Sequence, residues 1–210
     1  MKIFSFLLLV FVAGFTGDDP KLTQTKLVDG ISIGLPKEFY VMSDDDIAIK
    51  YPSTKKPLAM YTNIDRVVDF GLNVTKSKIP GTDLSVLKDF YKATILETYD
   101  KVSFIQDTIH TVNGKRLIAF EFVSTSDGIK KYSFFQYALV NGFIYIFNYT
   151  LPETLKDQWQ PTVKASMNTI RIDPRKLYDV APANPKEPEL RGKDARGILK
   201  EQNERKKKTK

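Results

Sequence analysis

The sequence predicts an α+β domain in which an antiparallel β-sheet is sandwiched between helices. Residues 102–150 alternate hydrophobic and aromatic side chains over four segments, which are separated by turn signals such as Asn113-Gly114 and Asn141-Gly142. Two-residue Asn-Gly loops favour tight hairpins. An amphipathic helical pattern precedes this stretch and another follows it. Together these observations indicate a meander with helical layers on its faces.

Composition limits the classes of function. A chain of 210 residues with 42% hydrophobic residues is long enough for one domain with terminal extensions. It contains no cysteine, which excludes disulfides, thiolate catalysis, cysteine-ligated metals and a lipid-modified cysteine. Of the net charge of +7, residues 174–210 carry 12 Lys and Arg against 6 Asp and Glu, so the rest carries 20 against 19. We therefore expect no nucleic-acid partner for the nearly neutral body.

The chain divides into four segments. Residues 1–17 contain Lys2, a short apolar run and small residues, which predicts a signal peptide, with an uncleaved anchor as the alternative. A polar leader is expected over 18–26, a folded domain over 27–173, and a basic, proline-containing tail over 174–210, disordered in isolation. The signal peptide predicts a periplasmic or secreted protein.

The first half of the domain shows three strand patterns and one helical pattern. Residues 31–35 and 47–51 alternate and end before a proline, which indicates two short strands. Residues 67–75 alternate most clearly, so we predict a strand with one buried face and one largely polar face. A helix capped by Thr82 or Asp83 follows, with apolar residues at three- and four-residue intervals.

The second half begins with the meander, whose four strands are predicted at about 102–112, 115–124, 130–140 and 143–150. The last strand is apolar on both faces, so it should be central, and a second helical layer must cover the other face. Pro152 is suited to open that helix. Pro161 predicts either a kink or a second helix that starts there. Residues 170–172 could add a short strand.

Three positions are candidates for chemistry, and each is interpreted as structural. His110 is the only histidine, so we expect an edge or half-buried ring with one hydrogen bond. Asp44-Asp45-Asp46 lacks the spacing and glycine of a calcium loop, which favours a solvated turn between strands. Glu121 is expected to face a cross-strand Lys or Ser on the wetter side of the sheet, with a buried functional acid as the alternative.

No other motif indicates an activity. The sequons at Asn73 and Asn148 fall inside predicted strands and are interpreted as non-functional. We therefore predict no enzyme, no cofactor and no catalytic or metal site. The candidate contact residues are the cations at the C-terminus: Arg205, Lys206, Lys207, Lys208 and Lys210.

Four short stretches carry a family resemblance: residues 34–39 (GLPKEF), 69–75 (DFGLNVT), Asn113-Gly114, and 147–152 (FNYTLP). With the order of elements over 27–172, the chain resembles the PsbP-like (Mog/PsbP) superfamily. The resemblance implies an α/β/α sandwich that binds rather than catalyses. Its members include a photosystem II subunit, a Ran-binding protein, envelope lipoproteins and chaperones, so the fold transfers no partner. This chain differs from the lipoproteins by lacking the cysteine and from the cytoplasmic members by its leader.

These observations predict an exported, non-enzymatic protein-binding or accessory module whose partner is another envelope protein. One alternative is a small-ligand-binding protein or enzyme with a sheet-side pocket lined by Glu121, Tyr137 and Tyr145. A second alternative is membrane-surface or nucleic-acid contact through residues 205–210.

Overall fold

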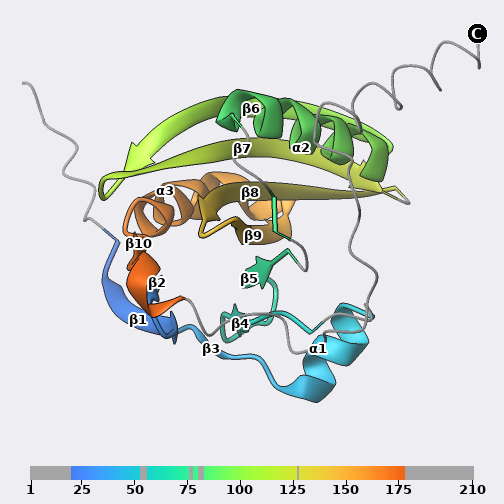
Figure 1. The fold of residues 1–210 in the computed structure, drawn as a ribbon. Helices are drawn as coiled ribbons and strands as arrows, with labels where there is room; N and C mark the ends of the chain where they lie inside the picture. The colour runs from blue at the N-terminus through green and yellow to red at the C-terminus, as the bar shows by residue number, and fades with distance from the viewer. Residues whose placement is uncertain (1–19, 53–55, 76–77, 80–82, 127, 178–210) are drawn as a thin grey trace, which may run out of the picture.

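The structure is a computed structural model that describes residues 20–52, 56–75, 78–79, 83–126 and 128–177. In these ranges the chain forms a seven-stranded antiparallel sheet, a three-stranded antiparallel sheet and three α-helices (Figure 1). The predicted α+β class, with an antiparallel sheet between helices, is confirmed. The predicted signal peptide and residues 178–210 lie outside the described residues.

The bounds of the elements are as follows. The large sheet contains β3 (Tyr40–Val41), β4 (Ala59–Thr62), β5 (Asp69–Val74), β6 (Lys101–Val112), β7 (Lys115–Ser126), β8 (Ile129–Val140) and β9 (Phe143–Pro152), in the order β3-β4-β5-β9-β8-β7-β6. The small sheet contains β1 (Leu22–Val28), β2 (Ile31–Pro36) and β10 (Arg171–Ile172), in the order β1-β2-β10. The helices are α1 (Asp44–Lys50), α2 (Leu84–Thr98) and α3 (Lys156–Met167), with 3₁₀ turns η1 (Glu153–Leu155) and η2 (Pro174–Lys176).

The meander forms as the turn signals predict. Both Asn-Gly pairs have positive φ at both residues, 46° and 77° at Asn113 and Gly114 and 53° and 85° at Asn141 and Gly142. This left-handed conformation matches the twist of two-residue hairpins. β9 pairs with β8 on one side and with β5 on the other, so its predicted central position is confirmed.

α2 covers one face of the large sheet. Asp83 caps it by accepting a hydrogen bond from the backbone N–H of Ser85 at 2.9 Å, as predicted. Its buried face includes Leu87 and Tyr91, and the Tyr91 ring stacks on Tyr137 of β8 with 4.2 Å between centroids. This helix and the β6–β8 face form one of the two apolar clusters.

α3 and the small sheet share the opposite face, around the larger apolar cluster. The Ser166 hydroxyl donates to the carbonyl of Gly34 at 2.5 Å, and the Gly34 amide donates to the Thr169 hydroxyl at 2.6 Å, which joins the end of α3 to β2. Pro152 ends β9, and Pro161 lies inside α3. The alternative in which Pro161 opens a second helix is therefore wrong.

Two local predictions for the first half are also wrong. Residues 47–51 belong to α1 or its C-cap instead of a strand, because Ser43 caps a helix by accepting from the amide of Asp46 at 3.1 Å. The three aspartates fill its first turn, where carboxylates complement the helix dipole, and do not form a turn between strands. β5 has the predicted buried apolar face, formed by Phe70, Leu72 and Val74, and a polar second face on which Asp69 is buried and Asn73 is partly exposed.

The two ends of the folded body extend beyond the predicted elements. Residues 22–26, expected in a polar leader, form most of β1 and pair with β2. After β10, η2 brings Leu177 into the main apolar cluster, where it is 2% exposed. The described fold therefore includes residues that the sequence analysis placed in the tail.

Candidate functional site

Glu121 lies under α3 and is fully buried. Its Oε1 accepts hydrogen bonds from the Tyr132 hydroxyl at 3.0 Å and from the Gln160 side-chain amide. The Lys164 ammonium lies 2.9 Å from Oε2, outside hydrogen-bond geometry, so this contact is mainly an ion pair. The prediction of a wetter, cross-strand environment is wrong, because the cation comes from a helix that follows the sheet in sequence.

Through these contacts, Glu121 holds α3 in position on the large sheet. Burial, followed by the nearby carboxylate, raises the pKa of the Tyr132 phenol, so the phenol remains a donor at neutral pH. Tyr137 belongs to the apolar cluster under α2, whereas Tyr145 belongs to the cluster on the α3 side. The structure therefore does not bring Glu121, Tyr137 and Tyr145 together, and the pocket predicted from them is not formed.

His110 occupies the edge strand β6, as expected. Its Nε2 lies 2.9 Å from the side-chain nitrogen of Gln136, and burial lowers the pKa of the imidazole. A neutral ring can then accept the amide hydrogen. The predicted half-buried histidine with one hydrogen bond is confirmed.

Asp69 attaches α1 to the α2 side of the large sheet. Its side chain is 3% exposed and accepts hydrogen bonds from the hydroxyls of Tyr51 at 2.5 Å and Thr62 at 2.7 Å. The Lys50 ammonium lies 2.6 Å from the same carboxylate. Burial and the Asp69 charge raise the pKa of the Tyr51 phenol, which keeps it protonated. The carboxylate thus holds the last turn of α1 against the start of β5.

Replacing Asp69 with asparagine should lower the free energy of unfolding by about 2 kcal/mol, because a buried ion pair and charge-assisted hydrogen bonds are lost. Urea unfolding followed by circular dichroism measures this change. Asp65→Asn is the matched control, since Asp65 is exposed in the neighbouring turn, and it should change stability by less than about 0.5 kcal/mol. Equal stability of the two variants would contradict the role of Asp69.

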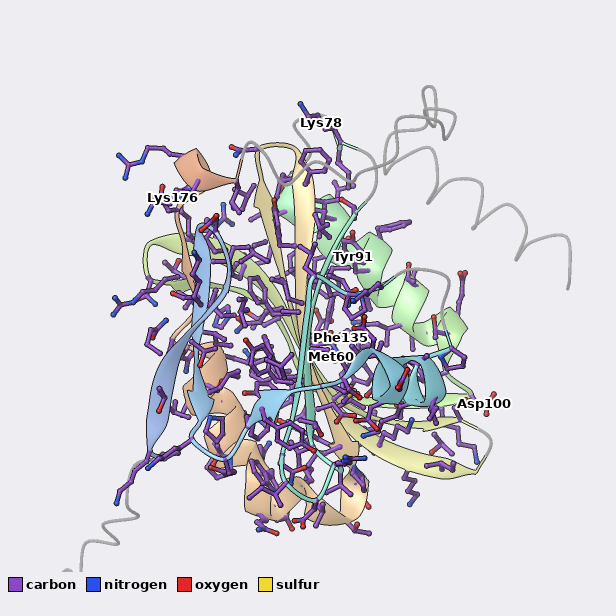
Figure 2. All side chains as sticks on the ribbon, turned by 90° about the horizontal axis from the view of Figure 1, so that it is seen from below. Met60, Lys78, Tyr91, Asp100, Phe135 and Lys176 are labelled. Carbon is purple, nitrogen blue, oxygen red and sulfur yellow. The ribbon has the colours of Figure 1, made fainter. Side chains whose placement is uncertain are left out.

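Between α1 and α2, part of the sheet surface over β5 and β9 is only half covered. We call the side chains of Asn73, Ile146, Asn148 and Thr150 the β5–β9 strip, and all four are partly exposed. Strand register places Asn73 opposite Ile146. Figure 2 shows α1 and α2 on the same side of the sheet, with the labelled Met60 and Phe135 over the central strands. The strip is therefore a partly exposed region on the face of the sheet that carries α2.

A glycine shapes the strip. Gly71 pairs with Asn148, and a Cβ at Gly71 would lie 2.9 Å from Asn148 Oδ1 and 3.1 Å from Met60 Sδ. The absence of a side chain lets the asparagine amide lie across β5. Within the described residues, the side-chain amides of Asn73 and Asn148 have no hydrogen-bond partner. Each can donate two hydrogen bonds and accept others, which suits the peptide groups of a bound polypeptide.

The strip ends at Thr150, which faces Asp69, the residue that holds the last turn of α1. Ile49 of α1 and Ile64 in the turn after β4 are 81% and 72% exposed, and we call them the α1 rim. Arg66 joins the segments that carry them, because its guanidinium lies 3.1 Å from Asp46 and donates to the Tyr40 hydroxyl at 3.1 Å. Exposed aliphatic residues next to half-buried amides are typical of a protein-binding surface.

The other candidates were the C-terminal cations and a metal site. The predicted contact residues Arg205, Lys206, Lys207, Lys208 and Lys210 lie outside the described residues. In the described ranges, no group of three or more His, Cys, Asp or Glu side chains could hold a metal ion. The helices of those ranges include none long and apolar enough to cross a membrane.

Sequence reasoning named the two asparagines only as sequons. Alternation along β9 predicts that its even-numbered residues share one face of the strand. The register of β9 with β5 could not be derived from the sequence. The α1 rim was missed because residues 47–51 resembled a strand. The Ser43 cap followed by three aspartates was the available signal for a helix there.

The sequence matches no protein-family model and no curated protein. Among solved structures, it is similar to the cyanobacterial PsbP protein (CyanoP) of Synechocystis sp. PCC 6803, with a TM-score of 0.54 and 11% identity over 78% of this chain and 99% of that chain. It is also similar to LpqN of Mycobacterium tuberculosis, described as involved in cell envelope biogenesis, with a TM-score of 0.53 and 11% identity over 75% of this chain and 88% of that one. The fold is PsbP-like, as the sequence resemblance implied.

Proposed function

We propose that this protein is an exported, non-enzymatic accessory module of the cell envelope that binds a protein partner on the β5–β9 strip and the α1 rim. The observation that carries the proposal is the pair of half-buried amides of Asn73 and Asn148, which have no hydrogen-bond partner in the described residues and lie beside exposed aliphatic side chains. Removing water from such amides is favourable only when a partner supplies hydrogen bonds in its place. Burial of the aliphatic rim against a partner lowers the free energy of the complex.

The envelope assignment is supported by two further observations. The N-terminal sequence has the pattern of a signal peptide, which would direct the chain to a periplasmic or secreted location. The PsbP-like fold is shared with LpqN, which is described as involved in cell envelope biogenesis. The basic residues at the C-terminus would add a second, charge-based contact, to a partner or to an anionic membrane surface.

A binding role agrees with the way the interior uses its polar groups. Glu121 and Asp69, the two buried carboxylates of the described residues, are each engaged by a lysine and by hydroxyl or amide donors. They therefore fix helices on the sheet and are not positioned against a reacting group.

Once a partner is captured from envelope extracts, Ile49→Asp should weaken its binding at least tenfold, because a charge would be buried against the partner. Binding is measured with the purified pair by calorimetry. Ile129→Asp is the matched control: Ile129 is 60% exposed at the β7–β8 hairpin and belongs to neither the strip nor the α1 rim, and its substitution should change Kd less than twofold.

A chain that ends at Leu177 separates the surface from the tail, because it keeps the buried Leu177 and removes residues 178–210. If the surface is the main contact, this chain retains the partner. The proposal fails if Ile49→Asp and Ile129→Asp bind equally, or if removal of the tail alone abolishes capture.

A further inference from the structure

The small sheet carries a row of polar side chains across its three strands. Backbone register pairs Lys26 of β1 with Ser32 of β2, and Ser32 with Arg171 of β10. Directly opposed residues in a sheet project from the same face, and neighbouring strands are ~4.8 Å apart. The row therefore places one cation on each side of the Ser32 hydroxyl group.

The row faces away from the core. Ile31 and Ile33, which alternate with Ser32, are buried at 2% and 0% exposure, whereas Lys26 and Arg171 are exposed. An open cleft of about 570 Å³ lies along this face, and its lining includes all three residues of the row together with Asn113 and Lys176. Figure 2 shows Lys176 at the end of the small sheet, on the opposite side of the molecule from α2.

The donors in the cleft are available for a ligand. Ser32 Oγ accepts a hydrogen bond from the Gln24 side-chain amide at 2.9 Å, so the Ser32 hydroxyl hydrogen remains free to donate. Within the described residues, Arg171 has no ion pair or side-chain hydrogen bond, and Lys176 acts on the cleft carboxylates Asp29 and Asp173 only as a nearby charge that lowers their pKa. Lys26 pairs with Asp29, but both side chains are about 70% exposed (69% and 73%), and such surface pairs are weak.

The acidic groups of the cleft do not cancel this charge. Asp29 is paired with Lys26, and the Asp173 carboxylate lies 3.1 Å from the Arg175 guanidinium. Each of the two carboxylates therefore faces a cation. The cleft lining contains three cations, Lys26, Arg171 and Lys176, and two carboxylates. With Arg175 bound to one carboxylate, the region keeps an excess of positive charge.

From this geometry we propose that the cleft binds a phosphate group, held by Arg171 and Lys26 on either side and by the Ser32 hydroxyl between them. A tetrahedral dianion can accept from donors that converge from several directions, and a guanidinium binds phosphate oxygens in pairs. The cleft is larger than a phosphate ion, which fits a phosphate that carries an organic group. This proposal does not depend on the proposed protein-binding surface, which lies on the other side of the large sheet.

The test is a titration of the full chain with inorganic phosphate, followed by amide NMR shifts. Saturable changes are expected at Lys26, Ser32 and Arg171. Arg171→Gln should weaken binding at least tenfold, and Ser32→Ala should weaken it by a smaller factor. Lys130→Gln is the matched control and should leave binding unchanged, because Lys130 is exposed on β8, where it pairs with Thr125 at the end of β7 that is far from the Asn113 hairpin.

Two comparisons identify the source of the phosphate. Retention on phosphatidylglycerol vesicles that is lost in Arg171→Gln would assign a lipid headgroup, and phosphate binding without such retention would assign a soluble ester. The basic tail is present in every variant, so only the difference in retention between Arg171→Gln and the unmodified chain is assigned to the cleft. The proposal is overturned if shifts do not saturate, if Arg171→Gln binds like the unmodified chain, or if acetate binds as tightly as phosphate.

Discussion

Replacing Lys164 with methionine should lower the free energy of unfolding by about 2–4 kcal/mol, because it leaves the Glu121 carboxylate in the core without its cation. Glu121 is 0% exposed, so water cannot take the place of the ammonium group. The Lys164 side chain is 42% exposed, which keeps the expected loss below that of a fully buried pair. Urea unfolding monitored by tryptophan fluorescence provides the measurement, since Trp159 lies on the same helix.

Two matched variants decide whether the ion pair is the cause. Lys156→Met removes another cation of α3, whose partner Asp157 is 94% exposed, and should cost less than about 0.5 kcal/mol. The double variant Glu121→Leu with Lys164→Met removes both charges and should be more stable than Lys164→Met alone. A double variant that is less stable than the single one would refute this explanation.

Ending the chain at Asp173 should destabilise the fold by about 2–4 kcal/mol relative to a chain that ends at Leu177. The longer chain keeps Leu177 in the main apolar cluster, whereas the shorter chain leaves a cavity of roughly one leucine side chain. The full-length Leu177→Ala variant should lose a similar amount, which separates the effect of the side chain from that of the chain end. Thermal unfolding of the three proteins is the measurement, and equal midpoints would show that Leu177 does not contribute to the core.

The large sheet could be derived from the sequence because its signals are local. Two Asn-Gly turns fix two hairpins of the meander, and the apolar character of both faces of β9 requires a strand with neighbours on each side. The two main helices follow from apolar residues at helical spacing and from the cap at Asp83.

The errors arose where tertiary contacts decide the outcome. β1 is polar in composition, so its sequence predicts no strand. It forms a strand because its backbone pairs with β2. α1 alternates like a strand, but the Ser43 cap and the attachment of its last turn to Asp69 select a helix. Glu121 was expected at a wet surface, because its partners Gln160 and Lys164 come from a helix about 40 residues later in the chain.

The candidate surface could be predicted only in fragments. The sequence marks Asn73 and Asn148 as strand residues, but only the register of β5 and β9 brings them onto one face. The close approach at Gly71 is equally a tertiary property, because Asn148 comes from a strand far away in sequence. Binding surfaces of this kind depend on pairing between distant strands, which periodicity alone does not specify.

Binding of a protein partner beside α1 can be tested by photocrosslinking in the native cell, with a photoreactive amino acid placed at position 49, 64 or 129 of the full chain. These positions are 81%, 72% and 60% exposed, so each probe can reach solvent. The same crosslinked partner is expected from positions 49 and 64 and none from position 129. Crosslinks of equal yield from all three positions, or from position 129 alone, would contradict this expectation.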